Sequence, residues 1–140
     1  MISAKGRPYQ VHVLRLLPGE DVRRSLESWC TEGSIEAACV VSAVGSVTRA
    51  HLRYGGRDEG TMTTGDLEVV ALSGTLSRHG GHLHLAVSDA AGVTKGGHLL
   101  TGTLVRTTLE VVVQEIGGLR FIRRRDERTG FDELFPEALP

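Results

Sequence analysis

The stretch that decides the fold runs from Gly81 to Leu99 and reads GHLHLAVSDAAGVTKGGHL. At its start, His82 and His84 are separated by one leucine, and apolar residues continue to alternate with other residues after them. Alternate side chains of a β-strand point to the same face, so both histidines share one face while the leucines enter the core from the other. The pattern predicts a strand over 82–88 and a short strand over 97–100.

The segment between these two strands predicts a tight hairpin. It contains turn residues, and its glycine can adopt a positive φ. With residues 90–92 as the loop, counting outward places His84 directly opposite His98, on the same face of the sheet. His82 lies two residues further along that face, so three imidazoles converge. A bulge at 96–97 would shift this register by one residue and turn His98 away.

Three converging imidazoles predict a metal site formed by His82, His84 and His98. Neutral imidazoles suit zinc, and ligand type alone also allows nickel, copper or iron. Three protein ligands leave a fourth position open, where a bound water has its pKa lowered to about 7. The alternative is a set of surface histidines on a polar sheet face. We interpret His79, which lies across Gly80-Gly81, as an exposed turn residue and not as a fourth ligand.

Outside this stretch, one helix and several further strands are predicted. Pro18-Gly19 opens the helix, Gly33 ends it, and Val22, Leu26 and Cys30 form one apolar stripe together with Trp29. The remaining apolar runs predict strands over 10–17, 37–44, 47–54, 67–76, 104–116 and 119–124. This is an α+β fold: a mostly antiparallel β-sheet with one long amphipathic helix.

Composition fits an ordinary globular chain. Of 140 residues, 40% are apolar and 24% are charged, and the formal net charge is -1. This length predicts a single domain over 1–140. A charge so close to zero argues against a surface built entirely for nucleic acid. We see no secretory signal and no apolar run long enough to cross a membrane, so we expect a cytoplasmic protein without membrane contact. Cys30 and Cys39 are interpreted as small buried residues.

Polar residues on other predicted strands are candidates for binding a small anionic ligand near the metal. Arg106 and Glu110 share one face of the 104–116 strand, which makes them candidate catalytic residues: the arginine for a carboxylate and the glutamate as a base or as a partner of a histidine. Arg53 and Glu68 are further candidates of the same kind. An exposed polar sheet face, or polar pairs at a subunit boundary, explains each of them equally well.

Two basic segments raise the question of DNA binding. Lys5-Gly6-Arg7-Pro8 is similar to part of an AT-hook, but it runs directly into the first predicted strand, and we interpret it as the lead-in to that strand. The second segment is rich in arginine: Arg120, Arg123, Arg124, Arg125 and Arg128. Of these, Arg123, Arg124 and Arg125 are the candidate phosphate contacts. Because acidic residues lie among and beyond them, we favour an ion-paired strand and loop, or a subunit contact.

Several segments resemble the plants-and-prokaryotes-conserved (PPC) domain family. They are 72–77 (LSGTLS), 81–89 (GHLHLAVSD), Gly92, 96–99 (GGHL), 107–113 (TTLEVVV) and the opening from Val13 to Leu26. The resemblance implies an α+β fold, a homotrimer and metal binding by the three histidines. Plant members of the family join this domain to an AT-hook and largely lack those histidines, so this chain resembles the histidine-bearing prokaryotic type.

A more distant resemblance concerns the site. The fold and the HxH motif followed by a later histidine are similar to those of acetolactate decarboxylase, a zinc enzyme. We therefore expect a zinc-binding PPC metalloprotein with a regulatory or DNA-associated role, and carry as the alternative a zinc enzyme acting on a small carboxylate. Whether the chain is an enzyme is not decided by its residues.

Overall fold

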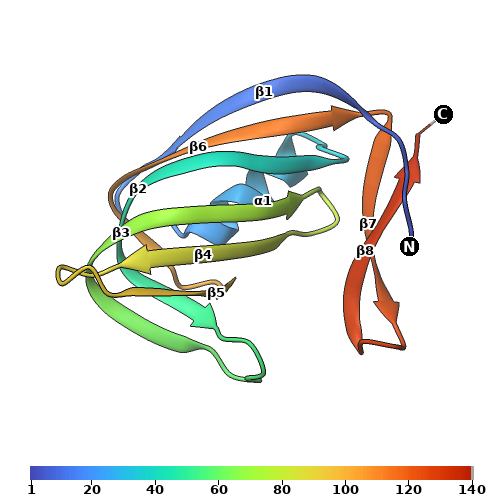
Figure 1. The fold of residues 1–140 in the computed structure, drawn as a ribbon. Helices are drawn as coiled ribbons and strands as arrows, with labels where there is room; N and C mark the ends of the chain where they lie inside the picture. The colour runs from blue at the N-terminus through green and yellow to red at the C-terminus, as the bar shows by residue number, and fades with distance from the viewer. Residues whose placement is uncertain (140) are drawn as a thin grey trace.

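The computed structural model describes residues 1–139 and contains eight strands and one helix within them (Figure 1). In chain order these are β1 (Arg7–Leu16), α1 (Val22–Glu32), β2 (Ala38–Arg53), β3 (Thr61–Leu76), β4 (His82–Ser88), β5 (Thr94–Leu99), β6 (Leu104–Gly117), β7 (Leu119–Asp126) and β8 (Phe131–Ala138).

Six of the strands form one antiparallel sheet, in the order β1-β6-β2-β3-β4-β5. The far end of β2 also pairs with β5, through Leu52 with Leu99 and Arg53 with His98. The sheet therefore curls until its β5 edge meets β2 again, while β7 and β8 stand apart as a two-stranded sheet (Figure 1). The predicted mostly antiparallel α+β architecture is confirmed.

The helix α1 is shorter than predicted, which corrects the prediction of a long amphipathic helix. It has 11 residues, an average length for a globular protein. The Asp21 side chain accepts a hydrogen bond from the backbone N–H of Arg24 and caps the start, and Gly33 closes the end. Val22, Leu26 and Cys30 are buried, so the predicted apolar stripe is the face that packs on the sheet.

Two strands differ from their predicted form. The segments 37–44 and 47–54 are one continuous strand, β2, which passes through Gly45. A Cβ on Gly45 would lie 2.1 Å from the carbonyl oxygen of Thr108, so the missing side chain lets β6 approach closely and the strand continues. The strand β8 was not predicted, because its sequence FDELFPEA contains a proline and does not alternate.

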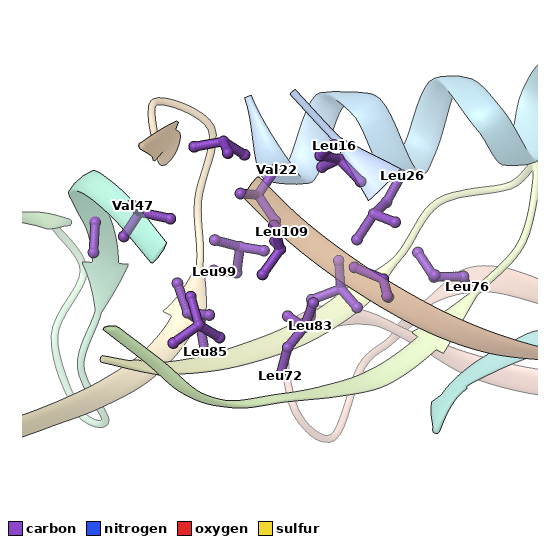
Figure 2. Close-up of a cluster of buried hydrophobic side chains, with 14 of the residues drawn as sticks. Leu16, Val22, Leu26, Val47, Leu72, Leu76, Leu83, Leu85, Leu99 and Leu109 are labelled. Atoms are coloured by element: carbon purple, nitrogen blue, oxygen red, sulfur yellow. The ribbon is translucent and has the colours of Figure 1, made fainter. Parts of the chain in front are cut away.

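The core lies between α1 and the inner face of the sheet. Figure 2 shows Val22 and Leu26 of the helix facing Leu83 and Leu85 of β4 across this core. Leu83 and Leu85 are 3% and 1% exposed. Their burial leaves the alternate positions of β4, which are His82 and His84, on the outer face.

The β7–β8 hairpin is attached to the main body mainly through Phe121. Its backbone N–H donates to the carbonyl of Glu36, and its own carbonyl accepts from the buried Ser77 hydroxyl at 2.8 Å. Both groups of Phe121 thus point away from β8, so Pro136, which lies opposite and lacks an N–H, costs the pairing no hydrogen bond. Beneath this contact, Leu119, Phe121 and Ala37 form a small second core.

Within residues 1–139, no helix is long and apolar enough to span a lipid bilayer.

Candidate metal centre

The β4–β5 hairpin has the predicted register. His84 pairs with His98, and the ladder continues without interruption to Ser88 and Thr94, so the glycines at 96–97 form no bulge. Asp89 shapes the turn, because its carboxylate accepts hydrogen bonds from the backbone N–H groups of residues 91 and 93, both at 2.9 Å. Gly92 has a φ of 78°, the left-handed conformation that the turn requires.

The three predicted histidines converge on the outer face of this hairpin. The Nε2 atoms of His82 and His84 each lie 3.2 Å from Nδ1 of His98. One ring nitrogen from each of the three residues lies within 4.8 Å of the other two. Tetrahedral zinc bonded to nitrogen at about 2.0–2.1 Å would separate two of its ligands by about 3.3 Å. The observed spacing therefore fits a single ion held by these nitrogens.

The charge state of the histidines also fits metal binding. Burial, then the neighbouring His84 and Arg123, lowers the pKa of His82. Burial, then Arg53, lowers the pKa of His98. Lowered pKa values favour neutral imidazoles at physiological pH, which is the form that binds metal.

The other three histidines have partners elsewhere. His12 contacts Glu115 at 2.9 Å, and Nδ1 of His51 lies 2.7 Å from the carbonyl oxygen of Thr101. His79 lies in the turn before β4, 3.4 Å from Glu36, outside the cluster. The interpretation of His79 as a turn residue agrees with this position.

Residues paired with the histidines share their face of the sheet. Thr75 of β3 lies opposite His82, and Arg53 of β2 lies opposite His98. Arg53 donates to the carbonyl of Arg57 and lies over the ring of Phe131, 5.7 Å from its centroid. Four residues were predicted to assist at the site: Arg53, Glu68, Arg106 and Glu110. Of these, Arg53 lies beside the histidine cluster.

A hollow of about 660 Å³ opens beside His82 and His98. It lies among α1, the 55–58 segment, the β4–β5 region and the β7–β8 hairpin. The basic residues that line it are Arg23, Arg53, Arg57 and Arg123, and the acidic ones are Asp58, Asp132 and Glu133. A small molecule in this hollow would reach the histidines and several guanidinium groups together.

Three predicted assisting residues lie away from this hollow. Arg106 pairs with Asp66 at 2.9 Å on an exposed surface, and Glu110 and Glu68 are exposed on β6 and β3. None of these three lines the hollow. The alternation of β6 correctly placed Arg106 and Glu110 on a polar face, but that face belongs to a different part of the sheet.

The arginine-rich segment divides between the two faces of β7 and the turn that follows it. Arg124 pairs with Glu137 and lies over the ring of Phe135, and Arg120 also contacts Glu137. Arg128 pairs with Asp126 at 2.6 Å, while Arg125 is exposed. This agrees with the interpretation as an ion-paired strand and loop. Arg123 is different, because it points to Thr75 and the hollow.

Sequence reasoning missed the contributions of Arg23 and Arg123 to the hollow. Arg23 donates to the carbonyl of Leu99, the residue after His98, at 2.9 Å. Arg123 had been considered only as a phosphate contact. No local signal marks either residue, since α1 and β7 reach the histidines through tertiary packing alone.

Comparison with known proteins identifies the family. The model of the Plants and Prokaryotes Conserved (PCC) domain, the PPC domain of the sequence analysis, matches residues 3–117. This chain belongs to the PPC domain family. Its β7–β8 hairpin lies beyond the matched residues.

Solved structures share the whole PPC fold. A hypothetical protein from Salmonella enterica is 41% identical, with a TM-score of 0.91 over 99% of this chain and 98% of its own. A metal-containing protein from Archaeoglobus fulgidus is 30% identical, with a TM-score of 0.83 over 96% of this chain and 99% of its own. These likenesses extend through the β7–β8 hairpin.

Curated relatives are longer proteins. The bifunctional protein GlmU of Synechococcus sp. (strain JA-3-3Ab) is 44% identical over 98% of this chain and 23% of its own length. AT-hook motif nuclear-localized protein 8 of Arabidopsis thaliana is 27% identical over 79% of this chain and 31% of its own length. The PPC chain thus spans less than a third of the length of these relatives.

Proposed function

We propose that this PPC-domain protein binds a transition metal ion, zinc first among them, through His82, His84 and His98. The convergence of their three ring nitrogens within 4.8 Å is the observation that carries the proposal. A metal-containing relative of the same fold from Archaeoglobus fulgidus supports it. When bound, zinc supplies a Lewis acid with an open position for water or a ligand oxygen.

The chain's own residues define what such a site does. Burial and nearby arginines keep His82 and His98 neutral and ready to bind. Of the residues described, only the three histidines form a cluster of possible ligands. The hollow beside it provides access for a small molecule. We propose that the protein senses or binds a small anionic ligand at this site, as a regulatory function.

A second candidate function is a zinc-dependent enzyme acting on a small carboxylate. The arginines that line the hollow favour it, because guanidinium groups bind carboxylates through paired hydrogen bonds. The resemblance to acetolactate decarboxylase, a zinc enzyme, is a further reason to consider this candidate. Turnover of small keto or hydroxy acids, lost in the histidine variants, would distinguish the enzyme from the sensor.

Metal binding is tested by the zinc content of protein purified without a histidine tag. We expect about one zinc per chain, and loss of that zinc in the double variant His84→Ala, His98→Ala, because one imidazole cannot hold the ion. His79→Ala is the matched control, since this histidine lies close in sequence but outside the cluster. Zinc that persists in the double variant would refute the site.

We also propose that the protein is a homotrimer in the cytoplasm and that residues 1–140 act as one domain. The outer face of the sheet supports self-association, because it exposes valines on β1, β2 and β3: Val11, Val13, Val41, Val44 and Val70, each more than half exposed. Light scattering after gel filtration measures the mass. A measured mass of one chain, the same in the Val13→Glu variant as in the unmodified protein, would refute the trimer.

DNA association is the remaining part of the proposed role. Plant relatives named as AT-hook nuclear proteins support it. Against a hook in this chain, Arg7 already belongs to β1 and pairs with Gly117. A binding assay over increasing salt tests the role, since phosphate contacts give a steep salt dependence. Absence of binding at low salt would remove it.

A further inference from the structure

Arg123, which lines the hollow beside the histidine cluster, forms no ion pair within residues 1–139; Arg53 forms none either, but it lies over the ring of Phe131. Arg123 is half-buried and makes one hydrogen bond within residues 1–139, from Nη2 to Thr75 Oγ1 at 2.8 Å. Its Nε is buried and has no partner. An arginine offers five N–H donors, so most of its hydrogen-bonding capacity is unused.

Neighbouring arginines of the segment differ in this respect. Arg120, Arg124 and Arg128 each form an ion pair with a carboxylate. In the part of the chain that the structure describes, Arg123 forms none, although Glu133 lies near enough to influence its pKa. Leaving a partly buried charge without an ion-pair partner is unfavourable, so an anion in the hollow would stabilise Arg123.

Thr75 fixes where this guanidinium lies. It pairs with His82 across the β3–β4 ladder, so both side chains are on the histidine face. Arg123 bonds to Thr75 and lines the same hollow as His82 and His98. The arginine therefore shares the hollow with two of the proposed metal ligands and lies near enough to His82 to affect the pKa of that imidazole.

We propose that Arg123 is an anion-binding residue of the metal site, where it holds the carboxylate of a small ligand whose neighbouring oxygen faces the metal. The ligand class is the small α-hydroxy or α-oxo carboxylates. This inference rests on the proposed metal function. Three carboxylates that line the hollow, Asp58, Asp132 and Glu133, oppose anion binding, and three further arginines that line it, Arg23, Arg53 and Arg57, favour it.

The test uses protein loaded with cobalt(II), whose visible spectrum reports a new oxygen ligand. Glycolate is the probe, and its neutral amide, glycolamide, is the matched small molecule. We expect glycolate to change the spectrum and glycolamide to have little effect. Arg123→Gln weakens glycolate binding about ten- to hundred-fold, the effect of losing a charged hydrogen bond. Arg123→Lys gives an intermediate loss, because it keeps the charge without the planar fork.

Arg124→Gln is the control variant, since Arg124 pairs with Glu137 on the other face of β7. It should bind glycolate as the unmodified protein does. Thermal unfolding and metal content are measured on the same samples, so that a folding defect is seen directly. Stoichiometric metal with glycolate affinity unchanged in Arg123→Gln would overturn the inference and leave the metal function intact.

Other outcomes are equally distinct. Metal-loaded protein that does not bind glycolate overturns the inference, with metal binding again unaffected. If the protein holds no metal, glycolate binding is followed by calorimetry instead. Binding that still depends on Arg123 would then support the anion site while refuting the metal function.

Discussion

The two hairpins that meet at the hollow were unequally visible in the sequence. The β4–β5 hairpin alternates strictly over His82–Ser88, and its turn contains an aspartate and a glycine that specify the loop. The β7–β8 hairpin pairs just as regularly, from Leu119 with Ala138 to Asp126 with Phe131. Its second strand contains Pro136 and shows no alternation. A regularly paired strand thus shows alternating apolar and polar residues only where one of its faces is buried in a core.

The same contrast appears in how each hairpin is held. Leu83, Leu85 and Val87 of β4 are all buried in the main core. The β7–β8 hairpin has only a small core, together with the hydrogen bonds of Phe121 and the one from Arg123 to Thr75. We expect the first hairpin to unfold with the whole protein, and the second to open locally.

The largest effect is expected from Leu85→Ala. This side chain is 1% exposed in the main core, so its truncation should lower the free energy of unfolding by about 2–5 kcal/mol. Denaturant unfolding gives the value, and metal affinity should fall because β4 holds two of the histidines. Val93→Ala, in the turn of the same hairpin and 55% exposed, is the control. Equal losses in the two variants would contradict the placement of the core.

A smaller and local effect is expected from Ser77→Ala. The Ser77 hydroxyl donates to the carbonyl of Phe121 and accepts from the backbone N–H of His79, so its removal leaves two groups unpaired. The cost should be about 1–3 kcal/mol. Hydrogen exchange should become faster in β7 and stay unchanged in β4, with Ser73→Ala on the exposed face as control. Faster exchange in both hairpins would mean that they open together.

The smallest effect concerns the tip of the second hairpin. Hydrogen bonds from Arg128 lower the pKa of Asp126 from 3.8 to about 2. Because the folded pKa lies below the ordinary value, the stabilisation is present above about pH 4 and is lost as the pH falls through about 2. Asp126→Asn should therefore lower the melting temperature slightly at pH 7, and the two curves should converge near pH 2. A difference that grows in acid would contradict this pairing.

Local patterns predicted the parts of the site that lie within one hairpin. The HxH alternation and the Asp89 turn were enough to place His84 opposite His98. Arg106 was a candidate only if its polar face met the histidines, because strand alternation gives a face without saying which neighbouring strand shares it. It pairs with Asp66 and does not line the hollow. Arg123 was missed as a site residue because its position depends on how β7 packs against β3.

The central claim is that three histidines of one hairpin hold a metal ion. X-ray absorption at the zinc edge of untagged, zinc-loaded protein tests it most directly. We predict three imidazole nitrogens at about 2.0–2.1 Å and one further oxygen at a similar distance. A sulfur ligand at about 2.3 Å, or a shell of oxygens without imidazole, would show that the ion binds elsewhere and would contradict the assignment to His82, His84 and His98.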